Sequence, residues 1–214
     1  NQRIATYLRT YLFSSINPDI ILITSFFEGF SDNCIHELDN DLIDCPVISI
    51  FYDLIPLLNP IKYLTNNPDF ERYYRQKLTK LKKLDALLAI SNSAAKEVQE
   101  HLNFEKKNIY NISSACDKEK FNTSIIEESY DVNSISPYLL YIGAGDPRKN
   151  LKGLLFAYSN LSPKLNHYKL VLAGKLLVPE LNQIDEWISF FDIDPLKVIK
   201  TGYINDRQLA ELYR

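Results

Sequence analysis

Short apolar runs recur along the chain, with longer helix-like stretches between them. The runs are nearly continuous rather than alternating, which is typical of strands buried on both faces of a parallel sheet. They cover residues 19–23, 46–51, 86–90, 138–142 and 168–173. Strands that alternate with helices predict right-handed βαβ units, so we expect an α/β fold built on open parallel sheets.

The stretches between the runs predict helices. One helix is expected from Leu151, with Asn150 placed to cap its start. A second is expected around Pro179, because proline suits a first helical turn. A third follows Ser91, which is also placed as a cap, and a fourth covers 69–84.

The polar stretch 126–136 interrupts this alternation and predicts a linker between domains at 1–125 and 137–214. No apolar run approaches the roughly 20 residues that a membrane-spanning helix needs. The chain contains no Met, and both ends stop within helical patterns. We therefore expect it to be a piece of a longer protein, truncated at both ends.

Charge and composition exclude several classes of function. Lys and Arg number 24 against 27 Asp and Glu, a net charge of −3, so the fold-wide basic field of a nucleic-acid-binding protein is absent. The cysteines Cys34, Cys45 and Cys116 do not have metal-ligand spacing, and the three histidines are scattered. We expect no metal, no nucleic-acid partner, and buried free thiols in a reducing cytoplasm.

The segment 141–151 carries the clearest candidate chemistry, because it joins a predicted strand to a predicted helix. Such a junction presents free backbone N–H groups and the positive end of the helix dipole. Gly143 and Gly145 allow a ligand to approach the backbone, and Arg148 and Lys149 add two cations. These features together favour a pyrophosphate-binding site.

Three interpretations of this segment remain open. A dinucleotide fingerprint requires a small residue at its third glycine position, where Arg148 stands. A strand–helix turn with solvated basic residues is the second interpretation. A site for the diphosphate of a nucleotide sugar is the third, and it is favoured by the surrounding sequence.

Several segments together resemble group 1 (family 4) retaining glycosyltransferases. Gly143-Ala-Gly-Asp-Pro-Arg-Lys-Asn-Leu resembles the start of their C-terminal domain, and Ser25-Phe-Phe-Glu-Gly-Phe resembles a loop of polysaccharide-assembling mannosyl- and rhamnosyltransferases. Further matches in family order lie at 51–60, 86–95, 170–175 and 201–213. The resemblance spans about residues 18–214.

The resemblance implies a GT-B fold of two Rossmann-like domains, with the acceptor side in 1–125 and the nucleotide-sugar side in 137–214. It implies transfer with retention from a nucleotide-diphosphate sugar to a growing surface polysaccharide or lipid-linked glycan, without a cofactor. The residues implied are Arg148 and Lys149 for catalysis, Gly143, Gly145, Gly174 and Lys175 for the donor, and Glu28, Tyr52 and Asp53 for the acceptor. Capping of a turn by Asp53 and solvation of Glu28 are the simpler alternatives.

Three departures from the family pattern bear on activity. The family's two-glutamate donor segment would fall beyond Tyr213, so we expect this fragment alone to be inactive. Ala144 stands where the family often has Arg, and Tyr52 stands where it has His, a residue that can act as a base at neutral pH. A catalytically degenerate GT-B module that binds a glycan or a partner subunit is therefore the alternative. The basic residues of 72–83 predict either a solvated helix face or peripheral contact with the inner face of the cell membrane.

Overall fold

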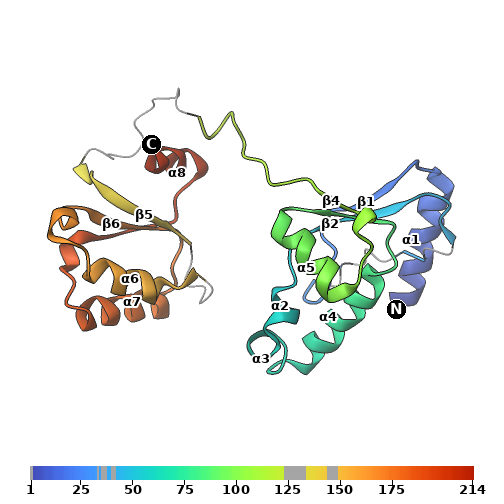
Figure 1. Cartoon of the computed structure of the whole chain (residues 1–214), viewed down its shortest axis with the longest axis horizontal. Helices are drawn as coiled ribbons and strands as arrows, with labels where there is room; N and C mark the ends of the chain where they lie inside the picture. Colours follow the sequence, from blue (N-terminus) through green and yellow to red (C-terminus); the bar gives the residue numbers. More distant parts are fainter. Residues whose placement is uncertain (1, 33, 35–37, 40–41, 123–133, 144–148) are drawn as a thin grey trace. The chain divides into compact units, whose positions relative to one another are not determined.

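The computed structural model describes residues 2–32, 34, 38–39, 42–122, 134–143 and 149–214 (Figure 1). Its contacts divide the chain into two compact units, Asn1–Ala115 and Cys116–Arg214. Each unit has parallel strands covered by helices, so the predicted α/β class is confirmed.

The first unit contains a four-stranded parallel sheet. Its strands are β1 (Ile21–Ile23), β2 (Val47–Phe51), β3 (Ala86–Ala89) and β4 (Ile109–Asn111), paired in that order. The first three lie within predicted apolar runs. The fourth was not predicted, because it is only three residues long and two of these residues are exposed.

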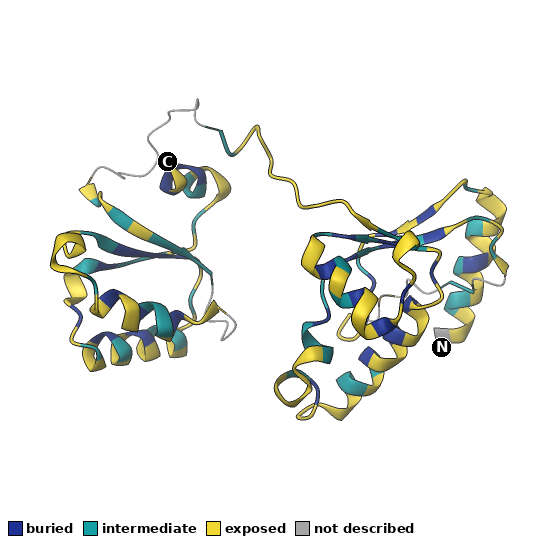
Figure 2. Ribbon diagram, viewed as in Figure 1, coloured by how far each residue is buried: buried dark blue, intermediate teal, exposed yellow. Residues whose placement is uncertain are grey.

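The helices of the first unit are α1 (Gln2–Ile16), α2 (Ile55–Leu58), α3 (Pro60–Tyr63), α4 (Pro68–Leu81) and α5 (Asn92–Leu102), with a 3-10 turn η2 (Lys106–Asn108). The Ser91 hydroxyl accepts from the Ala94 N–H at 3.1 Å, so the predicted cap of α5 is confirmed. Figure 2 shows the buried faces that these helices turn toward the sheet. Leu81, Leu87 and Val98 are fully buried there.

The second unit contains the parallel strands β5 (Tyr138–Ile142), β6 (Lys169–Ala173) and β7 (Val198–Gly202), paired in that order. Its helices are α6 (Leu151–Ser159), α7 (Val178–Phe190) and α8 (Asp206–Tyr213), with 3-10 turns η5 (Pro163–Leu165) and η6 (Pro195–Lys197). Figure 1 shows α6 and α7 on one face of the sheet and α8 on the other. The central strand β6 is therefore buried on both faces, as its continuous apolar run predicted.

The predicted cap at Asn150 is wrong. The residue precedes α6, but its backbone is left-handed, with φ of 49°, and its side chain makes no capping hydrogen bond. A side-chain cap needs an extended backbone at this position. The amide instead lies over Gly153, where a Cβ would be 2.5 Å from the Asn150 Nδ2 atom. The expected place of Pro179 in the first turn of α7 is confirmed.

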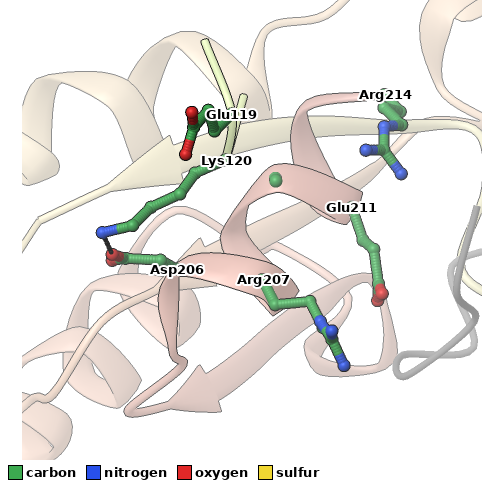
Figure 3. A pocket seen from close by; sticks show the side chains of 7 residues that line it. Glu119, Lys120, Asp206, Arg207, Glu211 and Arg214 are labelled. Carbon is green, nitrogen blue, oxygen red and sulfur yellow. Dashed lines mark hydrogen bonds and ion pairs between the residues drawn. The ribbon is translucent and has the colours of Figure 1, made fainter. Parts of the chain in front are cut away.

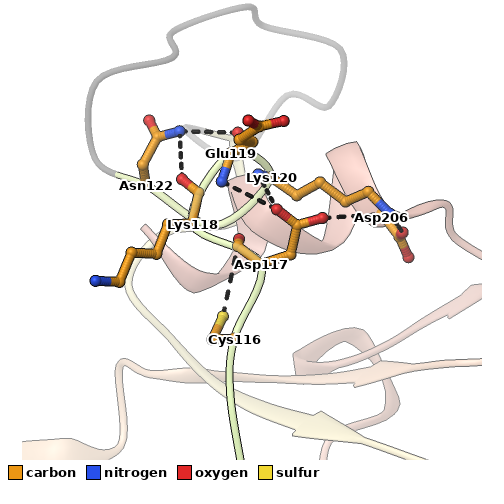
Figure 4. A network of polar contacts seen from close by, with 7 residues as sticks. All are labelled: Cys116, Asp117, Lys118, Glu119, Lys120, Asn122 and Asp206. Carbon is orange, nitrogen blue, oxygen red and sulfur yellow. Dashed lines mark hydrogen bonds and ion pairs between the residues drawn. The ribbon is translucent and has the colours of Figure 1, made fainter.

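Residues 116–122 were expected in the first domain, but their contacts place them in the second unit. The Lys120 ammonium lies 2.9 Å from the Asp206 carboxylate at the start of α8 (Figure 4). Arg214 donates to the Asn122 carbonyl from Nε at 3.0 Å and from Nη2 at 2.8 Å. Charged residues of this segment and of α8 together line a cavity of about 290 Å³ (Figure 3). The predicted linker at 126–136 lies largely outside the described residues, and it stays a prediction.

Candidate functional site

Three glycines stand at the carboxyl ends of adjacent strands in the second sheet. The Gly143 N–H donates to the Ala173 carbonyl, and the Gly174 N–H donates to the Gly202 carbonyl, each at 3.1 Å. A Cβ on Gly174 would lie 2.8 Å from the Gly143 carbonyl oxygen, at a φ of +134° that disfavours other residues. Gly143 and Gly174 therefore lie side by side at the edge where open α/β sheets bind ligands.

Lys149 is the described cation that packs against Gly143. Its Cγ lies 3.5 Å from the position that a Cβ on Gly143 would occupy, so the aliphatic part of its side chain packs over this glycine. Lys149 is exposed, and so is Lys175, which follows β6. Arg148 and Gly145 lie outside the described residues. The structure therefore brings Lys149 to the glycine-lined edge, and the roles of Arg148 and Gly145 stay predictions.

A cavity of about 410 Å³ lies beside these glycines. It is lined by the ends of β6 and β7 and by α7, through Gly174, Leu176, Leu181, Asp185, Lys200, Thr201 and Gly202. Lys200 forms an ion pair with Asp185, and only 24% of the Lys200 side chain is exposed. Neither residue was predicted. The available signal was a lysine inside the apolar pattern that leads to Gly202.

The parallel strands of the first sheet also present their following segments at one edge. Glu28 follows β1, and Tyr52 and Asp53 follow β2, so the three predicted acceptor residues share this edge. The Ser25 hydroxyl donates to the Glu28 Oε1 atom at 3.0 Å. Glu28 is exposed and lines a cavity of about 390 Å³ at the end of β1. Its role in acceptor binding stays a prediction.

The turn after β2 is fixed by two carboxylates. Asp53 accepts from the Ile55 N–H at 2.9 Å, which is the turn-capping contact weighed as the simpler alternative for this residue. Glu97 of α5 accepts from the Leu54 N–H at 3.1 Å. Tyr52 is 52% exposed. Sequence reasoning missed Glu97, because its partner is 43 residues away in the chain.

The basic residues of α4 and the turn after it do not form one solvated face. Arg72 lies 3.5 Å from Asp69 and Arg75 lies 2.8 Å from Glu71, and both are exposed ion pairs within the helix. Lys77 is buried, which contradicts the expectation of a solvated side chain. Contact of the remaining basic residues with a membrane stays a prediction.

Neither a membrane span nor a metal cluster is found in the described part of the chain. No helix there is long and apolar enough to cross a membrane. No group of three or more His, Cys, Asp or Glu residues is placed there to hold a metal ion. The expected burial of the cysteines is wrong for Cys34 and Cys116, which are exposed.

Comparison with known proteins adds to this geometry. No family model matches the chain. Two solved structures with low sequence identity share its fold. Anabaena HepE in complex with UDP is 14% identical, with a TM-score of 0.63, and the match covers 93% of this chain and 52% of HepE. A glycosyltransferase from Rickettsia africae is 16% identical, with a TM-score of 0.64, and the match covers 97% of this chain and 52% of that protein.

The curated relatives include serotype-specific mannosyltransferases WbdA of Escherichia coli. One is 34% identical over 211 residues, which is 96% of this chain and 26% of the relative. Another is 32% identical over the same length, again 26% of the relative. The chain has the GT-B fold, and almost all of it is similar to part of these mannosyltransferases. It spans about a quarter of the length of the curated relatives that it matches.

In this chain, the candidate donor and acceptor residues fall in different units. Gly143, Lys149 and Gly174 meet at the carboxyl edge of the second sheet. Glu28 and Asp53 lie at the carboxyl edge of the first. Glu97 and Lys200 support these edges through contacts with residues distant in sequence, so no local motif predicted them.

Proposed function

We propose that the full-length protein carrying this chain is a retaining hexosyltransferase. It moves mannose from a nucleotide-diphosphate sugar to a growing surface polysaccharide or lipid-linked glycan. Support for the sugar comes from the relatives, which are mannosyltransferases by name. Support for the donor class comes from HepE, a protein of the same fold that is in complex with UDP.

One observation carries this proposal: Lys149 packs over Gly143 at an edge where Gly174 approaches within contact distance. When the bond from the sugar C1 to the diphosphate oxygen breaks, negative charge develops on the leaving diphosphate. A fixed ammonium group beside open backbone can stabilise that charge without a metal. In the proposal Lys149 supplies this charge, and Arg148 supplies a second one.

The cavity of about 410 Å³ gives the nucleoside end of the donor a place next to the same glycines. Its volume lies within the roughly 300–1,000 Å³ that is common for small-molecule sites. Asp185 and Lys200 bring polar groups to its wall, and the exposed Lys175 directly follows Gly174 in the chain. In the proposal Gly143, Gly145 and Gly174 allow the diphosphate to lie between this cavity and Lys149.

The acceptor is proposed to bind the first unit through Glu28, Tyr52 and Asp53. The exposed Glu28 carboxylate can accept from sugar hydroxyls, and the exposed Tyr52 hydroxyl can donate to them. Asp53 already accepts from Ile55, so its contribution is to hold the turn that presents Tyr52.

Replacing Lys149 with Ala in the full-length protein tests the donor assignment. We expect kcat to fall by about 10²-fold or more, the usual effect of losing one electrostatic contact to the transition state. The assay measures transfer to octyl α-mannoside from UDP-glucose, UDP-N-acetylglucosamine, GDP-mannose and dTDP-rhamnose in parallel.

Lys152→Ala is the matched control. Lys152 is also exposed, but its ammonium lies 6.0 Å from the Trp187 ring rather than at the glycine edge. Its loss should leave kcat within about twofold of the parent, as for surface changes away from a site. Equal kinetics for Lys149→Ala and Lys152→Ala would refute the assignment. Acceptor binding without transfer from any donor would favour the non-catalytic GT-B module.

A further inference from the structure

The loop that carries Glu28 is held from the side by α4. The Tyr73 hydroxyl donates to the Phe27 carbonyl oxygen at 3.3 Å and also to the carbonyl oxygen of Glu28. These contacts join residues 45 and 46 positions apart in the chain. They fix the backbone at the residue whose carboxylate is proposed to meet the acceptor.

Aromatic packing reinforces the same contact. The Phe27 ring stacks on the Tyr74 ring with centroids 5.0 Å apart. The Phe30 ring lies 5.4 Å from the Tyr73 ring and 5.2 Å from the Phe70 ring. Rings before and after Glu28 are thus anchored on one helix, which leaves the intervening backbone few alternative positions.

Lys77 adds a buried cation to this cluster. Only 3% of the residue is exposed, and its ammonium lies 5.3 Å from the Tyr73 ring centroid and 5.6 Å from the Phe26 ring centroid. Both distances are within the range of a cation–π interaction, which is stronger when the cation is removed from water. Lys77 therefore ties the Tyr73 ring to the start of the loop.

The loop itself is tightly turned at the next residue. Gly29 has a φ of +103°, and a Cβ there would overlap the Cys34 carbonyl oxygen and lie 3.2 Å from the Tyr73 hydroxyl. At its exposed end, the Glu28 carboxylate accepts from the Ser25 hydroxyl. Glu28 is thus fixed at its backbone by α4 and at its carboxylate by its own loop.

We propose that Tyr73, supported by Lys77, is a positioning residue that sets the affinity of the acceptor site by holding Glu28. The inference rests on the proposed glycosyl transfer and on Glu28 as an acceptor residue. Tyr73 itself does not contact the substrate. Its hydroxyl holds the backbone from which the Glu28 carboxylate reaches the cavity at the end of β1.

Tyr73→Phe in the full-length protein removes the hydroxyl and keeps the ring. We expect the KM for octyl α-mannoside to rise about fivefold to tenfold, the effect of losing one hydrogen-bond donor. The kcat and the donor KM should stay within about twofold, because the contact is made equally in the ground and transition states. Lys77→Met should change the acceptor KM in the same direction.

Tyr74→Phe is the matched control, since it removes a hydroxyl from the neighbouring residue of the same helix. That hydroxyl has no hydrogen-bond partner in the described part of the chain. A double-mutant cycle completes the test. In a Glu28→Gln background, Tyr73→Phe should cause little further rise in the acceptor KM, because both changes act through one carboxylate.

Each outcome decides between the two proposals. If the parent transfers sugar but Tyr73→Phe raises the acceptor KM no more than Tyr74→Phe does, the positioning role is overturned and the proposed function stands. The same holds if Tyr73→Phe and Glu28→Gln act additively, or if kcat and both KM values change together. If the parent transfers sugar from no donor in the panel, the proposed function fails, and the positioning role fails with it.

Discussion

Gly174→Ala is a direct test of the close approach between the ends of β5 and β6. The added Cβ would lie 2.8 Å from the Gly143 carbonyl oxygen. That is about 0.5 Å inside the usual carbon–oxygen contact distance. The backbone angle of +134° adds strain of about 1–3 kcal/mol for a residue with a side chain. Together these effects predict that the β5–β6 edge loses roughly 3 kcal/mol of local stability.

Gly202→Ala supplies the control at the same edge. Gly202 also has a positive φ, of +70°, but no heavy atom of the described residues lies within 4 Å of its Cβ position. Its replacement should therefore cost only the left-handed backbone term, about 1 kcal/mol. The difference between the two variants isolates the contact with Gly143 from the cost of the backbone conformation.

Hydrogen exchange of β5 and β6 amides in the full-length protein measures this local stability. A loss of about 3 kcal/mol corresponds to roughly 150-fold faster exchange, against about fivefold for the loss of about 1 kcal/mol in Gly202→Ala. Gly174→Ala should also weaken nucleotide-sugar binding, because it forces Gly143 away from its present position. Equal exchange rates in the two variants would show that the strand ends do not approach as described.

The remaining predictions concern one pair of helix caps and one buried hydroxyl. Ser91→Ala should destabilise α5 by about 1 kcal/mol, because it removes the acceptor of the Ala94 N–H. Asn150→Ala should destabilise α6 by less than half of that amount, because the Asn150 side chain makes no capping hydrogen bond. The amide exchange rates of the two helices measure both losses of stability. Burial, and then the charge of Asp53, raises the pKa of the Tyr74 hydroxyl. The folded state therefore holds this proton more tightly, and its stabilising effect is lost as pH rises above about 10, the ordinary tyrosine value. In urea unfolding at pH 7, Tyr74→Phe should be equal to the parent in stability or about 1 kcal/mol more stable. The difference in unfolding free energy should increase above pH 10. A parent protein that is the more stable of the two at high pH would contradict this prediction.

The strands that could be predicted from sequence are those with uninterrupted apolar runs. The residues of β6 after Lys169 are buried on both faces, so each of these positions selects an apolar side chain and the pattern is plain. In β7, Lys200 interrupts the pattern, because its ammonium pairs with Asp185. Periodicity describes burial, so it fails where a strand position carries a paired charge.

Only those parts of the candidate site that have a local sequence motif could be predicted. Glycines at strand ends and an adjacent lysine have a local signature, and the structure does bring Gly143 and Lys149 together. The prediction of a solvated Lys77 side chain was wrong, because it was based on the charge of the residue and not on its position in the helix. Three residues after Tyr74 and four before Leu81, it belongs to the apolar stripe by helical spacing. In the structure its ammonium lies over the Phe26 and Tyr73 rings, and no local sequence pattern indicates these neighbours.

The two sheets hold their functional edges by different means, and this difference determines where substitutions act. In the second unit the strand ends approach directly, so the backbone at Gly174 fixes the geometry and tolerates no side chain. In the first unit the segments after β1 and β2 are fixed by side chains from helices, Tyr73 from α4 and Glu97 from α5. In the second unit, the substitutions that disturb this edge should therefore be those of the glycines themselves. In the first unit they should act from helix positions that never meet the acceptor, and so change its affinity rather than the rate of sugar transfer.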